Sequence, residues 1–64
     1  MQQENPVLSI KETATALRIS PRQVARLIAA GELLSFSIGS RRLIRAETLR
    51  AFVARLETQS RQAA

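Results

Sequence analysis

The stretch RISPRQVARLIAAGELLSFSIGSRRLIR, residues 18–45, contains the signals that decide the fold. Ser20 suits an N-cap, and Pro21 suits the first helical position, where its missing N–H costs nothing. Gln23 completes a capping box with Ser20. Gly31 supplies the left-handed residue that commonly ends a helix. The stretch therefore predicts a short helix between Pro21 and Gly31 that is closed at both ends.

After this helix the spacing of apolar residues changes from three or four positions, as in a helix, to two positions, as in a strand. Leu34, Phe36 and Ile38 alternate with serines, which predicts a strand with one apolar face. Gly39-Ser40 suits a two-residue type II′ turn, because glycine is favoured at its first central position. Arg41–Ile44 is then the returning strand. We expect a β-hairpin whose tip carries two adjacent arginines.

Helices are predicted on both sides of this stretch. Upstream, a capping box at Ser9 and Glu12 begins a helix of about two turns. Its apolar stripe consists of Ile10, Ala14 and Leu17. Downstream, a helix begins near Ala46, and its stripe consists of Leu49, Phe52, Val53 and Leu56. The order predicts a mainly α fold with a small β-hairpin: a winged helix-turn-helix with a two-stranded wing and a C-terminal helix.

With 64 residues, the chain has room for one domain. We expect a flexible N-terminal arm at 1–7, the winged helix-turn-helix at 8–57 and a flexible tail at 58–64. Cysteine and histidine are absent, which removes disulfides and the usual zinc ligands. The opening MQQENP resembles no secretory signal, and no apolar run of about 18 residues predicts a membrane span. We therefore expect a cytoplasmic protein.

The positive charge is confined to the stretch that decides the fold. Residues 18–45 contain six arginines and one glutamate, a net charge of +5 that equals the charge of the whole chain. Such a local excess indicates a polyanionic partner, and arginine suits bidentate contacts to phosphate and guanine. The alternative is a solvated surface that only confers solubility.

The sequence argues against an enzyme. Histidine, cysteine and aspartate are absent, and the glutamates form no paired constellation with Lys11. Gly31 and Gly39 are explained by a helix end and a turn, so no glycine-rich phosphate loop is present. We expect no catalytic residue, cofactor, metal ion or small-molecule ligand.

Six short motifs occur in a fixed order between residues 8 and 56. They are Leu8-Ser9, Ala14, Ser20 with Val24, Ala30-Gly31-Glu32-Leu33, Gly39-Ser40-Arg41-Arg42, and Leu49 with Phe52. In these motifs the chain resembles the MerR-like excisionase DNA-binding domains, nearly along its whole length. One departure is Ala25, where members of that family often carry a tyrosine or tryptophan that packs on the DNA backbone.

The resemblance implies an excisionase, also called a recombination directionality factor, of a phage or other mobile element. Such proteins have no catalytic activity. They bind and bend attachment-site double-stranded DNA so that a partner integrase performs excision, and we expect copies to self-associate cooperatively on the DNA. A small MerR-like transcriptional regulator is the alternative. A second alternative is a basic protein-interaction module whose arginines meet an acidic protein.

The candidate DNA-binding residues lie on the predicted second helix, the wing, and the turns around them. They are Lys11, Arg18, Ser20, Arg22, Gln23, Arg26, Ser40, Arg41 and Arg42. Gln23 has two interpretations, because it either reads adenine or only completes the capping box. Alternation along the strand places either Arg41 or Arg42, but not both, on the DNA face of the wing. Arg18 either contacts a phosphate or stays solvated.

Overall fold

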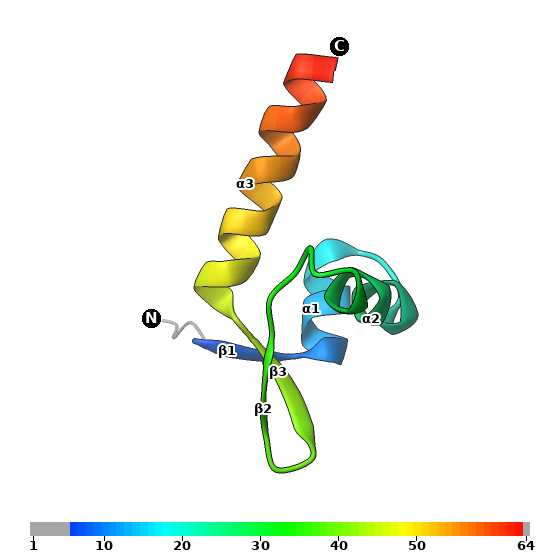
Figure 1. Ribbon diagram of the computed structural model, residues 1–64, viewed down its shortest axis with the longest axis vertical. Helices are drawn as coiled ribbons and strands as arrows, with labels where there is room; N and C mark the ends of the chain where they lie inside the picture. Colours follow the sequence, from blue (N-terminus) through cyan, green and yellow to red (C-terminus); the bar gives the residue numbers. More distant parts are fainter. Residues whose placement is uncertain (1–5, 64) are drawn as a thin grey trace.

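The computed structural model describes the backbone of residues 6–63 and the side chains of residues 6–61. Its elements are β1 (Val7–Ser9), α1 (Ile10–Leu17), α2 (Pro21–Ala29), β2 (Phe36–Ile38), β3 (Arg41–Arg45) and α3 (Ala46–Ala63). Figure 1 shows α1 and α2 side by side, the β2–β3 hairpin extending below them, and α3 projecting away from both. The predicted winged helix-turn-helix is confirmed.

Both short helices begin with the capping boxes that the sequence predicts. Ser9 Oγ accepts a hydrogen bond from the Glu12 N–H at 3.0 Å, and Glu12 Oε1 accepts one from the Ser9 N–H at 2.8 Å. Ser20 and Gln23 repeat this arrangement at 3.1 Å in both directions. Each box satisfies backbone donors that a helix start leaves unpaired. These local bonds set where α1 and α2 begin.

The two helices end in the same way, each at a residue in the left-handed region. At the end of α2, Gly31 has φ 79°, and the N–H groups of Gly31 and Glu32 donate to carbonyls one turn back. At the end of α1 that position is held by Arg18, with φ 61°. A side chain in this conformation is strained, whereas glycine is not. The turn between α1 and α2 therefore stores some strain at Arg18.

The sheet has three strands in the order β1-β3-β2, all antiparallel. Gly39 (φ 61°) and Ser40 connect Ile38 to its partner Arg41, so the two-residue hairpin loop is confirmed. Strand β1 was not predicted. It pairs Val7 with Arg45, and the Ala46 N–H donates to the Pro6 carbonyl at 2.9 Å. Residues 6 and 7 of the expected arm are therefore tied to the fold, and residues 1–5 lie outside the described residues.

The core collects one or two side chains from each helix and from the sheet. Its buried members are Ala14, Val24, Leu33, Ile44, Leu49 and Phe52. Leu33, which directly precedes the predicted strand, is 1 % exposed, whereas its neighbour Leu34 is 71 % exposed. Ile38 is also exposed. The expected apolar strand face therefore does not point into the core, because Ile44 of β3 occupies that side of the sheet.

Thr13 is the buried polar residue of this core. Its hydroxyl has no hydrogen-bond partner among the described residues. An unpaired buried hydroxyl costs about 1–3 kcal/mol. Part of the stability of a small core is therefore lost at this position.

Helix α3 is longer than the sequence predicts. The apolar stripe stops at Leu56, yet the helix continues to Ala63, so residues 58–63 are helical where a flexible tail was expected. The spacing of apolar residues shows which part of a helix is buried, but it does not show where an exposed helix ends. Gln, Arg and Ala favour helix without a buried face. The side chains from Ala54 to Arg61 are exposed. No helix in the described part of the chain is long and apolar enough to cross a membrane.

Candidate nucleic-acid interface

Helix α2 buries Val24 and turns a second face to solvent. That solvent face consists of Arg22, Ala25, Arg26 and Ala29, all exposed. Arg22 and Arg26 are one turn apart, so two like charges lie on the same side of the helix and repel each other. The two alanines between and beside them add little bulk. The face therefore combines positive charge with a surface that another molecule can approach closely.

The side chains of Arg22 and Arg26 are free within the described part of the molecule. No hydrogen bond or ion pair engages them there. The same is true of Arg18, which is exposed at the turn before α2, and of Lys11 in the first turn of α1. These four cations lie in or around the helix-turn-helix, and none has an ion-pair partner among the described residues.

Ser20 and Gln23 are occupied by the cap. Gln23 Oε1 accepts from the Ser20 N–H at 3.1 Å, and the Gln23 N–H donates to Ser20 Oγ at the same distance. Reading adenine needs the amide oxygen and nitrogen together. Since the oxygen already holds the cap, the geometry favours the structural interpretation of Gln23.

The wing places its two tip arginines on opposite faces of the sheet. Arg42 lies across from Ser37, and Arg41 lies across from Ile38. Since side chains alternate along a strand, Arg42 shares its face with Ile44, which packs in the core with Val24 of α2. Arg42 is therefore on the side of the sheet where the helices lie, and Arg41 is on the other side. Ser40 is exposed in the turn.

A contact across the hairpin holds Arg42. Its Nη1 donates to Ser35 Oγ at 3.2 Å. Ser35 precedes β2 and is half-buried, so the contact directs the Arg42 side chain back along the wing. Sequence reasoning missed this contact, because the two residues meet only when the hairpin closes.

Two other arginines have structural partners. Arg55 of α3 donates to the Glu32 carbonyl at 3.1 Å, and its guanidinium lies 5.7 Å from the centre of the Phe52 ring. It ties α3 to the segment that leaves α2. Arg45 pairs with Glu47 at 3.2 Å at the start of α3, with both side chains exposed. Arg45 and Arg55 are therefore engaged by other described residues, unlike the four cations around the helix-turn-helix.

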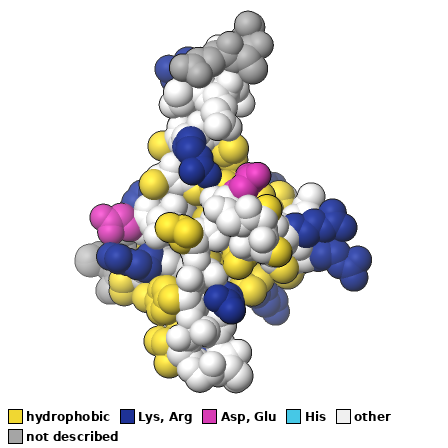
Figure 2. Space-filling model, in the orientation of Figure 1, with side chains coloured by type: hydrophobic (Ala, Val, Ile, Leu, Met, Phe, Trp, Pro, Cys, Tyr) yellow, Lys and Arg dark blue, Asp and Glu magenta, His cyan; other side chains and the backbone are white. Residues whose placement is uncertain are grey.

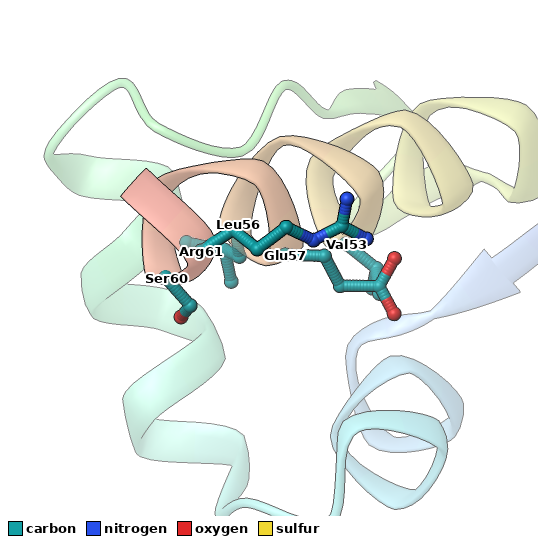
Figure 3. Close-up of a pocket in the computed structure, with 5 residues that line it drawn as sticks. All are labelled: Val53, Leu56, Glu57, Ser60 and Arg61. Atoms are coloured by element: carbon teal, nitrogen blue, oxygen red, sulfur yellow. The ribbon is translucent and has the colours of Figure 1, made fainter. Parts of the chain in front are cut away.

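Figure 2 shows where the charges gather. Lys and Arg side chains cluster over the end of the molecule that carries α2, and apolar side chains run down one edge of the wing. A surface hollow of about 530 Å³ lies elsewhere, on the projecting part of α3. There Glu57 and Arg61 extend along the helix beside Val53 (Figure 3). That hollow carries one acid and one base and lies outside the arginine cluster.

The described residues contain no group of three or more carboxylate, histidine or cysteine side chains that would hold a metal ion. Their exposed chemistry is a set of arginines on a short helix and a hairpin. Such a surface is suited to bind an extended polyanion.

Comparison with known families identifies a match over residues 7–57 to the helix-turn-helix domain family. The matched range runs from the first residue of β1 into α3, and so includes the three-stranded sheet as well as the two helices. A comparison with curated proteins finds no match to this chain. The family match and the fold agree, and the chain belongs to the helix-turn-helix domain family, whose fold binds double-stranded DNA.

Proposed function

We propose that this protein is an excisionase, a DNA-binding accessory factor that bends attachment-site DNA so that a partner integrase excises a mobile element. The observation that carries the DNA-binding part is the solvent face of α2, with two unpartnered arginines on a helix capped at both ends. The excisionase part rests on the resemblance of the six motifs between residues 8 and 56.

In this proposal α2 enters the major groove and the wing contacts the adjacent minor groove or backbone. Arg22 and Arg26 are the base-reading candidates, and Ala25 between them suits contact with a thymine methyl group. Arg42 is the wing residue on the side of α2. Arg18 and Lys11 contact phosphates, and Ser20 contributes the N-terminus of α2, where backbone N–H groups attract anions.

A single module of this size covers little DNA, so affinity comes from several copies bound side by side. Their combined contacts offset the energy of bending the duplex. Such a protein bends the DNA without reacting with it, and the integrase performs every bond-breaking step. This division fits the residues proposed to contact DNA, which are cations with serines and an alanine beside them.

The deciding experiment is excision in vitro with the cognate integrase of the element. The proposal predicts that excision of an attachment-site substrate requires the protein and that the Arg22→Ala/Arg26→Ala double variant does not support it. The matched control is Arg50→Ala/Arg61→Ala, which removes the same charge from α3 and should retain activity. Excision that proceeds equally well without the protein would refute the directionality role while leaving DNA binding intact.

A circular-permutation gel assay tests the architectural step separately. We expect the electrophoretic mobility of the complex to depend on where the site lies within the DNA fragment, as it does for bent DNA. A protein that binds without bending and represses transcription from a promoter containing its site is instead the small transcriptional regulator.

A further inference from the structure

One face of the sheet is not used by the core. Cross-strand partners lie on the same face, so the pairs Phe36–Leu43, Ile38–Arg41 and Val7–Arg45 all point away from the buried side chain of Ile44. We call this the outer sheet face; its residues are Val7, Phe36, Ile38, Arg41, Leu43 and Arg45. None of its apolar residues belongs to the core cluster or packs against it.

The outer sheet face and the residue beside it carry two of the three exposed large apolar residues of the described molecule. These three residues of the described molecule are Leu34, Ile38 and Leu56, with exposed fractions of 71 %, 64 % and 41 %. Ile38 lies on the outer sheet face, and Leu34 lies beside it, lining the same hollow as Phe36. Contiguous apolar surface bordered by charge is typical of interaction sites.

Arg45 stands between two hollows on this face. The first, about 240 Å³, is lined by Leu34, Ser35, Phe36, Arg45 and Thr48. The second, about 270 Å³, is lined by Pro6, Val7, Arg45, Ala46, Glu47 and Arg50. The Arg45–Glu47 pair lies at their junction with side chains 64 % and 75 % exposed, and such exposed pairs hold weakly. A stronger acidic partner can therefore displace Glu47.

The charges of this face decide among its possible occupants. A second copy related by a two-fold axis would bring identical arginines together, and the chain already carries a net charge of +5. DNA held by α2 lies on the side of Arg42, which points away from the outer sheet face. The remaining occupant is a protein segment that offers carboxylates to Arg41 and Arg45 and apolar side chains to Phe36 and Ile38.

We propose that the outer sheet face binds an extended segment of a second protein with the pattern acidic-x-apolar-x-acidic, where x is any residue. Only every second residue of an extended segment faces the sheet, so residues i, i+2 and i+4 lie over Arg41, Leu43 and Arg45 of β3. Carboxylates at i and i+4 meet the two arginines, and an apolar side chain at i+2 lies over Leu43 and Phe36. The site is separate from the arginine face of α2. The protein can therefore hold DNA and a protein partner at once, and the inference rests on the proposed binding of DNA through α2.

The test is selection of short random peptides displayed on phage, with the protein immobilised on a duplex so that its DNA surface is covered. We expect selected peptides to be enriched in the pattern acidic-x-apolar-x-acidic. A labelled synthetic copy of one of them is then titrated by fluorescence anisotropy. Arg45→Glu should weaken this binding by about tenfold, since it turns attraction into repulsion.

Matched variants locate the site. Arg61→Glu makes the same charge change outside the outer sheet face and should weaken binding by no more than about twofold. Ile38→Ser removes an exposed apolar side chain without touching the core and should weaken binding by about threefold to tenfold. Glu47→Gln frees Arg45 and should strengthen peptide binding by about twofold to fivefold. Circular dichroism verifies that each variant is folded.

Three results would overturn the inference. The first is a selection without acidic enrichment, or peptide binding that responds equally to Arg45→Glu and Arg61→Glu. The second is that Ile38→Ser weakens duplex binding instead, which would assign the face to DNA. The third is a dimer in sedimentation that Ile38→Ser dissociates, which would assign it to a second copy.

Discussion

Helix α2 and the wing both carry arginines, but they hold them differently. On α2, Arg22 and Arg26 lie on a helix closed by a capping box and by Gly31, and neither has a partner among the described side chains. On the wing, Arg42 is held by Ser35, and Arg41 points to the other side of the sheet. The comparison indicates that α2 presents two arginines without partners on one helix face, whereas the wing places one arginine on each face of the sheet.

The largest effect is expected from removing both charges of α2. Arg22→Ala/Arg26→Ala should weaken duplex binding by about 2–6 kcal/mol, at least about thirtyfold, because each arginine that contacts a base contributes about 1–3 kcal/mol. Thermal stability should stay constant or rise slightly, since a repulsive pair is lost. Anisotropy with a labelled duplex measures the affinity.

The matched control for this variant is Arg50→Ala/Arg61→Ala. It removes the same charge from exposed positions of α3, where the loss should stay within about fivefold. Equal losses in the two double variants would mean that net charge alone drives binding and that α2 has no special part.

The wing gives the next effect, because its two arginines should not be equivalent. Arg42→Ala should weaken duplex binding by about tenfold and Arg41→Ala by about threefold or less, since only Arg42 lies on the side of α2. Both measurements use the same duplex and salt. A larger loss for Arg41 would show that the wing meets DNA with its outer face.

A smaller effect, on stability alone, compares a serine in the cap with a serine in the wing turn. Ser20→Ala removes the acceptor for the Gln23 N–H and should lower the free energy of unfolding by about 1 kcal/mol. Ser40→Ala, in the exposed hairpin turn, should change it by less than about 0.5 kcal/mol. Urea unfolding followed by circular dichroism measures both. Identical midpoints would mean that the cap contributes nothing to the fold.

The smallest effect is expected at Arg18, whose φ of 61° favours glycine. Arg18→Gly should raise the free energy of unfolding by about 0.5–1 kcal/mol, while Arg18→Ala, which keeps the strained backbone, should not. Both remove the charge, so both should reduce the salt dependence of DNA binding by about one counterion. Destabilisation by Arg18→Gly would show that the side chain itself holds the turn.

Features that depend on neighbours in the sequence were predicted well. The capping boxes at Ser9 and Ser20 each join residues three positions apart, and Gly31 and Gly39 act through their own backbone. These caps and turns can be predicted without knowing how the rest of the chain packs. For the same reason, the placement of Arg22 and Arg26 on one helix face followed from their spacing.

Features that depend on distant residues were missed. Strand β1 exists because Leu8 meets Ile44, and α3 is fixed by a bond from Arg55 to Glu32. Once β3 lies between two strands, Ile44 fills the core side of the sheet, and Leu34 and Ile38 are left outside. Local alternation predicted that a strand had an apolar face, and only the sheet order determines which way that face points.

Salt dependence of duplex binding by the unaltered protein tests the central claim most directly. If about four to six of the arginines and Lys11 neutralise phosphates, the slope of log K against log salt concentration should be about −4 to −5. Titrations of one labelled duplex over a range of salt concentrations give this slope. A slope near zero, or no binding at low salt, would contradict the account.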